Sequence, residues 1–256
     1  MNRKYADALV LAILMALAVM LSMFLDAEFI TSIGLFFVLP SIWLSFRKPK
    51  HVKKLVVFSV IFALPFTLII DHLAVLDNSW DVPTIFPFRI FGTVPIEDII
   101  WGICLVYLTT IFYEYFLDKR KDKFMWRHMS YFFVLVFLLL TTFTFFLVSY
   151  PELLHIPYTY LVVGLAFVLM PTILVLISFP HLLTKFFSTL AYFFPLALLM
   201  ELTALILGHW SFPGKNFIGW VDIMGQKFPF EELFFWFLLL PIAILSYYEF
   251  FNDDRR

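Results

Sequence analysis

Long apolar runs alternate with short charged connections along the whole chain. Eight of these runs approach or exceed the roughly 20 mostly apolar residues that a helix needs to cross a bilayer. They cover 6–25, 29–46, 52–70, 95–117, 129–149, 158–179, 182–207 and 229–250. None shows the period-2 alternation of a β-barrel strand, so the pattern predicts an all-α integral membrane protein of about eight transmembrane helices.

Composition points to the same solvent. The 256 residues are 62% hydrophobic, 21% aromatic and 14% charged, whereas soluble domains are about 45–50% apolar and about 25% charged. A water-soluble fold of this length could not bury so much apolar surface, so lipid is the expected solvent. The net charge of −1 gives no basic surface and argues against a nucleic-acid partner. The single cysteine, Cys104, excludes an intrachain disulfide and a thiolate metal cluster.

Basic residues predict the orientation, because Lys and Arg concentrate in cytoplasmic connections. With the N-terminus inside, only Arg89, Lys215 and Lys227 fall in outer connections. The inner segments hold the rest: Arg3, Lys4, Arg47, Lys48, Lys50, Lys53, Lys54, Lys119, Arg120, Lys121, Lys123, Arg127, Lys185, Arg255 and Arg256. This bias predicts both termini in the cytoplasm of a multi-pass cell-membrane protein. The two long outer connections, about 71–94 and 208–228, are rich in Trp, Phe, Pro and Asp and are expected to fold against the membrane.

The chain repeats itself at an offset of about 130–135 residues. Three polar anchors recur in the same order. The matching segments are Asp71 with Trp80 and Glu201 with Trp210, then 93–98 and 227–232, and finally 113–116 and 248–251. We therefore predict two tandem four-helix repeats, 1–125 and 126–256, in one membrane domain. An even number of helices per repeat makes the repeats parallel, related by an axis along the membrane normal.

The most specific motif is Pro-x-Glu-(Asp/Glu), which occurs at 95–98 and again at 229–232. Pro at the first position and acids in the first turn are also ordinary features of a helix start. Two copies at equivalent positions favour a function, because carboxylates at membrane depth are costly and usually functional. Consecutive carboxylates project about 100° apart on a helix, so the two acids of one motif cannot point the same way.

Aromatic side chains accompany the motif carboxylates. At α-helical spacing Glu97 shares a face with Trp101, and Glu231 shares one with Phe235. A carboxyl group against an aromatic wall is a plausible proton donor, because burial favours its protonated form. The helix N-terminus acts in the opposite direction, and the sequence alone does not decide between them.

The sequence is compatible with two different roles for several further residues. Asp71 and Glu201 occupy equivalent outer ends of the third and seventh spans, where each could face a cavity or be a solvated charge. His72 and His209 could join a proton relay or be polar tips at the interface. Trp80 and Trp210 could line a pocket or belong to the interfacial belt, to which we assign Trp220. Glu114 and Glu249, at the cytoplasmic span ends, are expected to be relics of the repeat or interface contacts.

Other chemistries leave no signature in this sequence. There is no Gly-rich phosphate loop or dinucleotide fingerprint, and no His-x-x-x-His or cysteine cluster for a metal. There is also no Asp-x-x-x-Asp pair of the kind that prenyl diphosphate enzymes use with magnesium. Acid chemistry on an apolar substrate, with no cofactor and no metal, fits what is present.

Paired Pro-x-Glu-(Glu/Asp) motifs on small apolar multi-span repeats resemble the lycopene cyclases of the heterodimeric type, which occur as two small subunits or as one fused chain. Residues 228–235, Phe-Pro-Phe-Glu-Glu-Leu-Phe-Phe, resemble the family signature, and 94–98 resemble its partner. The first copy departs by ending in Asp98 instead of a second Glu. The resemblance implies a fused cyclase, and it covers most of the chain through the repeat.

What the resemblance implies is a redox-neutral isomerisation of a linear carotene in carotenoid biosynthesis. An acid protonates the terminal double bond of lycopene, an internal double bond attacks the cation to close a six-membered ring, and a base removes a ring proton. The catalytic candidates are Glu97 and Glu231, with Asp98 and Glu232 supporting or sharing their role. Pocket or relay candidates are Asp71, Glu201, Trp80, Trp210, Trp101 and Phe235.

Two other classes of function stay open at this point. A carotenoid hydratase or another membrane terpenoid cyclase would share the protonation step and differ in what captures the cation. A small proton- or cation-coupled transporter would use the repeat carboxylates for binding, although the helix interiors hold few Ser and no Asn or Gln. The expected partners are a lipophilic carotene and membrane lipid, while a homo-oligomer and contact with other carotenoid enzymes are both compatible with the sequence.

Overall fold

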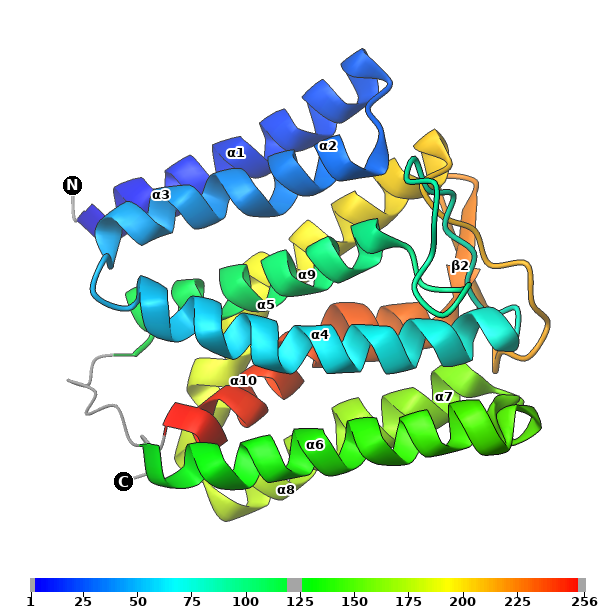
Figure 1. Cartoon of the computed structure of the whole chain (residues 1–256). Helices are drawn as coiled ribbons and strands as arrows, with labels where there is room; N and C mark the ends of the chain where they lie inside the picture. Colours follow the sequence, from blue (N-terminus) through cyan, green and yellow to red (C-terminus); the bar gives the residue numbers. More distant parts are fainter. Residues whose placement is uncertain (1–2, 119–125, 253–256) are drawn as a thin grey trace.

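The computed structural model describes residues 3–118 and 126–252, with 126–133 and 250–252 described by their backbone alone. Within these ranges seven helical segments are long and apolar enough to cross a membrane. They are Arg3–Leu25, Phe29–Arg47, Val52–Leu76, Ile96–Phe116, Thr159–Ser178, Pro180–Leu207 and Glu232–Glu249. Helix α6, Trp126–Ser149, is the eighth member of the bundle (Figure 1). The chain is thus an all-α multi-pass membrane protein, which confirms the predicted fold class.

The first four spans contain five α-helices and one π-helix. They are α1 (Arg3–Leu25), α2 (Phe29–Ile33), the π-helix η1 (Gly34–Val38), α3 (Leu39–Arg47), α4 (Val52–Leu76) and α5 (Ile96–Phe116). The remaining elements are α6, η2 (Pro151–Leu154), α7 (Thr159–Val163), the π-helix η3 (Gly164–Leu169), α8 (Met170–Ser178), η4 (Pro180–Leu182), α9 (Leu183–Leu207), β1 (Trp220–Ile223), β2 (Gln226–Pro229), the π-helix η5 (Glu232–Leu239) and α10 (Leu240–Asn252).

The described chain begins and ends at the same end of the bundle. Helix α1 begins and α10 ends there, whereas the long connections that follow α4 and α9 lie at the opposite end (Figure 1). This arrangement places the two connections on one side of the membrane. The basic residues at 119–125, Arg255 and Arg256, which contribute to the predicted charge bias, lie outside the described residues.

Each π-helical segment is followed by a proline two residues beyond its end. The prolines are Pro40 after η1, Pro171 after η3 and Pro241 after η5. Proline lacks the backbone N–H and its ring crowds the carbonyl of the preceding turn, so the helix must widen or bend there. A single π turn is a common way to accommodate this, and η1 and η3 do so at equivalent positions of the repeat.

The second half carries one extra residue between its Pro-x-Glu-(Asp/Glu) motif and the tyrosine of its last repeated segment. Tyr113 follows Pro95 by 18 residues, whereas Tyr248 follows Pro229 by 19. Helix α5 is regular throughout, and η5 absorbs the additional residue in its wider turns. From Trp101 onward, the matching residue of the second half is therefore found 135 positions later and not 134.

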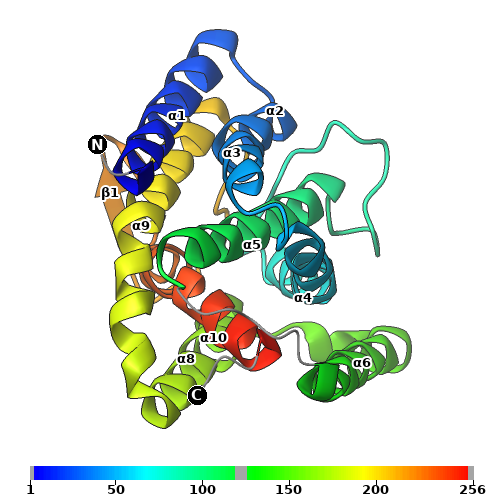
Figure 2. The same cartoon turned by 90° about the vertical axis from the view of Figure 1, so that its left-hand side faces the viewer.

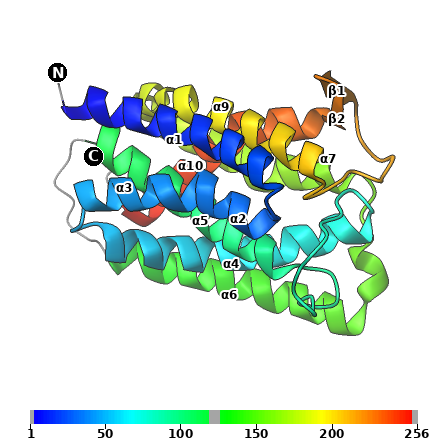
Figure 3. The same cartoon turned by 90° about the horizontal axis from the view of Figure 1, so that it is seen from above.

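The two halves exchange their first helices across the bundle. Helix α5 packs against α10 at the centre, α1 packs on α9, and α6 packs on α4. Figure 2 shows α5 and α10 enclosed by the other helices, and Figure 3 shows α1 beside α9 and α6 beside α4. The centre of the molecule is thus the junction between the halves.

Equivalent residues meet face to face where the long connections cross. Asp81 and Ser211 form reciprocal backbone N–H···O bonds of 3.0 and 2.9 Å. The neighbouring rings of Trp80 and Trp210 stack with centroids 5.2 Å apart. These contacts pair positions that the sequence repeat makes equivalent and hold the two connections together over the helix ends.

A reciprocal pair of hydrogen bonds joins the halves at the opposite end. Tyr113 donates to the Glu249 carboxylate, and Tyr248 donates to that of Glu114. Glu114 also contacts Lys54 at 3.0 Å and the His51 ring at 3.2 Å. The two glutamates are fully buried, so they are interface contacts between the halves.

The short β-hairpin of β1 and β2 is the feature that the all-α prediction did not include. Its strands pair in register from Trp220 opposite Pro229 to Ile223 opposite Gln226. The two-residue turn consists of Met224 and Gly225, both with positive φ (55° and 81°). Such turns match the twist of paired strands, and Gly adopts this conformation without strain.

The surroundings of Gly34 in η1 and Gly164 in η3 predict opposite effects on stability when each glycine is replaced by alanine. A Cβ at Gly164 would lie 2.4 Å from the Phe235 ring, whereas one at Gly34 would meet nothing within 4 Å. Gly164→Ala should therefore lower the free energy of unfolding by about 1–3 kcal/mol through overpacking. Gly34→Ala should be neutral or stabilising by up to about 1 kcal/mol, because Ala favours helix. Detergent-unfolding midpoints compare the two variants, and equal midpoints would contradict the packing assigned to Phe235.

Candidate active site

Four acidic side chains gather between the central helices in two matching pairs. The first pair is Asp71 on α4 and Asp98 on α5, and their carboxyl groups are close enough to interact electrostatically. The second is Glu201 on α9 with Glu232 at the start of η5, close enough to interact electrostatically. Two carboxylates this close in an apolar interior repel each other, so each pair is suited to sharing a proton.

Asp71 and Glu201 lie inside their helices and not at the span ends that the sequence predicted. Helix α4 continues to Leu76 and α9 to Leu207, which is more than one turn past each acid. Glu201 is fully buried, and Asp71 is partly buried and lines a cavity. Both residues therefore belong to the interior, and the solvated-charge interpretation does not apply.

Two indole N–H groups from the long connections donate hydrogen bonds to these acids. Trp80 donates to Asp98 at 3.3 Å, and Trp210 donates to Glu201 at 3.1 Å. Because the two rings stack, the acidic pairs are linked through aromatic side chains from both long connections. Trp80 and Trp210 are buried, whereas Trp220 is 50% exposed, as expected for an interfacial residue.

Tyr160 at the start of α7 completes the cluster and was not foreseen from sequence. It lies close to Glu232, and the charges of all four acids act on its phenol group. The equivalent position of the first half is Ile30, so this phenol belongs to one half only. A tyrosine at the beginning of an apolar run is a weak signal, since an interfacial tyrosine has the same sequence context.

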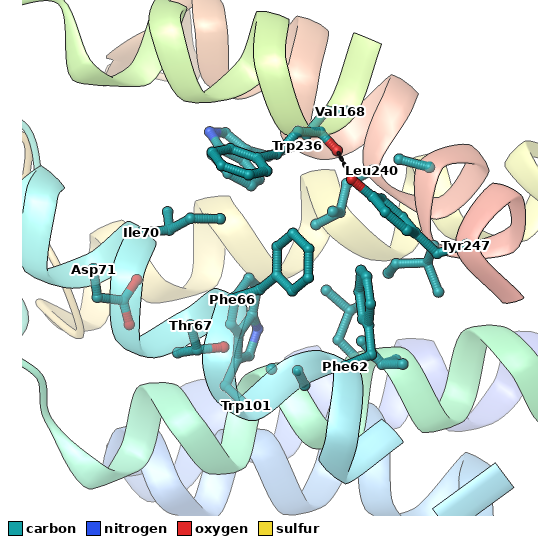
Figure 4. Close-up of a pocket in the computed structure, with 17 residues that line it drawn as sticks. Phe62, Phe66, Thr67, Ile70, Asp71, Trp101, Val168, Trp236, Leu240 and Tyr247 are labelled. Atoms are coloured by element: carbon teal, nitrogen blue, oxygen red, sulfur yellow. Dashed lines mark hydrogen bonds between the residues drawn. The ribbon is translucent and has the colours of Figure 1, made fainter. Parts of the chain in front are cut away.

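Two cavities flank the central helices, each beside one acidic pair. A cavity of about 90 Å³ lies between α4, α5, η3 and α10 with Asp71 at its edge (Figure 4). A second, of about 40 Å³, lies between η1, α5, α9 and η5 and touches Glu201 and Glu232. Both are walled by Trp101, Leu105, Trp236 and Leu240.

The cavity walls are almost entirely apolar and rich in aromatic rings. In Figure 4, Trp236 and Trp101 stand on opposite sides, and Phe66 projects between them. The indole Nε1 atoms of Trp101 and Trp236 are buried without a hydrogen-bond partner among the described residues. Each cavity therefore combines aromatic faces with one or two carboxyl groups.

Trp236 occupies the place that the sequence assigned to Phe235. The sequence prediction placed Phe235 four residues after Glu231, as in a regular α-helix. Because η5 is π-helical, the residue that faces the cavities lies five positions after Glu231. Phe235 instead packs against Gly164 and the neighbouring Val168. The pocket prediction for Phe235 is thus replaced by Trp236, while Trp101 lines both cavities as predicted.

The first acid of each motif faces the long connections. Glu97 accepts hydrogen bonds from the Thr84 hydroxyl at 2.8 and 2.9 Å and from the Ile85 N–H at 2.9 Å. Glu231 accepts one from the Ile218 N–H at 2.7 Å. Both side chains are buried, yet their contacts fix the outer loops, and the second acid of each motif is the one that faces its pair.

The two candidate relay histidines lie against hydroxyl groups. His72 contacts Thr93 at 2.7 Å, and His209 contacts Ser32 at 2.9 Å while stacking on Phe29. Burial lowers the pKa of His209 to about 4, so its ring is neutral near neutral pH. Among the described residues, neither histidine hydrogen-bonds any of the four acids, and we assign both to packing of the outer end.

Comparisons with protein-family models, curated proteins and solved structures find no match for this chain. Among the described residues, no group of three or more His, Cys, Asp or Glu side chains has the geometry to hold a metal ion.

Proposed function

We propose that this protein is a membrane-embedded lycopene cyclase that closes the linear ends of a carotene into six-membered rings. The observation that carries the proposal is the placement of paired carboxyl groups against apolar, aromatic cavities at the junction of the halves. The two carboxyl groups of a pair can serve as proton donor and proton acceptor, and few other polar side chains line the cavities. An acid-initiated isomerisation of a hydrocarbon requires these catalytic groups in an apolar site.

The proton balance of the reaction fits an acidic pair. One carboxyl group delivers a proton to the terminal double bond, which creates a tertiary cation. Attack by the internal double bond forms the ring bond and moves the positive charge into the ring. A carboxylate then removes a ring proton, so no electrons are exchanged and the acid is restored. Asp71 with Asp98, and Glu201 with Glu232, are the pairs we assign to these transfers.

The aromatic walls account for stabilisation of the cation. Trp101 and Trp236 present their rings to both cavities, and a cation over an indole face is stabilised by about 2 kcal/mol or more when water is absent. The nearby carboxylates supply preorganised negative charge. Exclusion of water matters because a hydrated cation would become a tertiary alcohol.

The proposal also implies a route for the substrate and an orientation of the protein in the membrane. Long polyenes dissolve in the bilayer, so a substrate would reach the cavities sideways between helices. The fifteen-to-three distribution of basic residues supports an orientation with both ends of the chain in the cytoplasm. The acidic pairs then lie toward the outer half of the membrane.

The proposal is tested by expressing the full chain in a bacterium that accumulates lycopene. We expect rings in the extracted pigments, identified by chromatography and mass spectrometry as carotenes of unchanged mass. Tertiary alcohols, with the mass increased by water, would indicate a hydratase. Unchanged lycopene beside well-expressed, membrane-inserted protein would contradict the proposal.

A further inference from the structure

A third hollow lies on the opposite face of α5 from the two acidic cavities. It is a groove of about 290 Å³ between α3, α4 and α5. Its polar side chains are Ser41, Ser45, Ser59, Cys104 and Tyr107, and the others are Val and Ile. It shares no lining residue with either acidic cavity. Ile42 and Val56 at its edge are exposed, so the groove opens toward lipid.

The hydrogen bonds in the groove leave the Ser41 hydroxyl without a partner and the Tyr107 oxygen able to accept. Ser45 donates its only hydroxyl proton to the Ser41 carbonyl at 2.7 Å, so Tyr107 must be the donor in its own 2.7 Å contact with Ser45. The Tyr107 oxygen keeps lone pairs that can accept. The Ser41 hydroxyl oxygen has no hydrogen-bond partner among the described residues, although Ser41 is only 7% exposed.

An unmade hydrogen bond is costly at this depth. The lipid around the groove offers no water to satisfy the Ser41 hydroxyl. Leaving a buried donor unpaired costs about 1–3 kcal/mol. A ligand that supplies the missing partner would recover much of that free energy.

The second half keeps a hydroxyl group at two of the five matching positions and has apolar side chains at the other three. The matching positions are Thr172 for Ser41, Leu176 for Ser45, Thr189 for Ser59, Leu239 for Cys104 and Ile242 for Tyr107. Thr172 satisfies its hydroxyl on the Val168 carbonyl at 2.7 Å. Since the second half forms the matching helices without a polar residue for Ser45, Cys104 or Tyr107, the presence of these three residues in the first half points to a ligand.

We propose that this groove binds a long-chain lipid alcohol, that is, a hydrocarbon body with one hydroxyl group. A hydroxyl group can accept from Ser41 and donate to Tyr107 at the same time. A plain hydrocarbon would leave both unpaired. A charged headgroup would find no ionised side chain among the described residues that line the groove. The proposal is independent of ring formation.

Direct binding tests the proposal on the purified full chain in lipid nanodiscs, with tritiated 1-hexadecanol as the probe. We expect saturable binding above partition into empty nanodiscs, and weak competition by hexadecane. Ser41→Ala and Tyr107→Phe should each weaken binding about fivefold, the effect of one hydrogen bond of about 1 kcal/mol. The matched control, Thr172→Ala in the second half, should bind as the wild type does.

Cys104 locates the binding on the wild-type chain. It is the only cysteine and lines the groove, so bound 1-hexadecanol should slow its alkylation by N-ethylmaleimide while hexadecane does not. Three results would each overturn the proposal: absence of saturable binding, equal competition by the alkane, or unchanged affinity in both groove variants.

Discussion

Exchanging Asp98 and Glu232 together for Asn and Gln is expected to reduce ring formation by about 10²–10⁴-fold, the usual contribution of general acid–base catalysis. The amides keep nearly the same shape and still accept hydrogen bonds, but they cannot deliver a proton. Each exchange removes the member of an acidic pair that comes from a helix start at the junction of the halves. Pigment analysis in the lycopene-accumulating host, normalised to the amount of membrane-inserted protein, measures the effect.

The matched control exchanges the adjacent acids, Glu97→Gln with Glu231→Gln. Their carbonyl oxygens can still accept from the loop N–H groups of Ile85 and Ile218. We expect this variant to lose at most about tenfold, equivalent to roughly 1.4 kcal/mol of loop positioning. The reverse ranking, with the control inactive and the Asp98/Glu232 variant active, would return proton transfer to the first acid of each motif.

Lys54→Met is expected to lower the free energy of unfolding by about 3 kcal/mol, because it leaves the Glu114 carboxylate buried without its ammonium partner. Lys54 lies 3.0 Å from Glu114, and the exposed fractions of the two side chains are 10% and 1%. Glu114 also accepts from Tyr248 of the other half. The loss should therefore weaken the junction between the halves and not a single helix.

Lys53→Met is the control for this prediction. It removes the same charge one residue away, from an exposed side chain, and should change the free energy of unfolding by less than about 0.5 kcal/mol. SDS-induced unfolding in mixed micelles, followed by circular dichroism, gives both values. Similar losses for the two variants would show that net charge, and not the buried pair, sets the effect.

The sequence indicated which residues matter more accurately than it indicated which way they face. The motif search found Asp98 and Glu232 but ranked Glu97 and Glu231 above them. Consecutive helix residues diverge by about 100°, so one acid of each motif had to face away from the cavity. Which one depends on where the long connections pack, and those contacts come from residues more than ten positions away.

Helix regularity was the second assumption that failed. The three prolines after the π segments are visible in the sequence, and so is the extra residue of the second half. Their joint consequence, that Trp236 and not Phe235 faces the cavities, needs the actual path of η5. The position of Tyr160 beside the acidic pairs could not be predicted for a similar reason, because α7 reaches these pairs only through packing between distant spans.

By itself, the sequence determined the solvent, the spans and the repeat. Lipid demands helices of about 20 apolar residues whose backbone groups are satisfied within each helix, so these features are local and can be read one segment at a time. The tertiary structure decided which acids pair, which rings wall the cavities and which hydroxyl stays unpaired in the groove. Those outcomes depend on side chains that meet from different helices, and no spacing along a single helix contains that information.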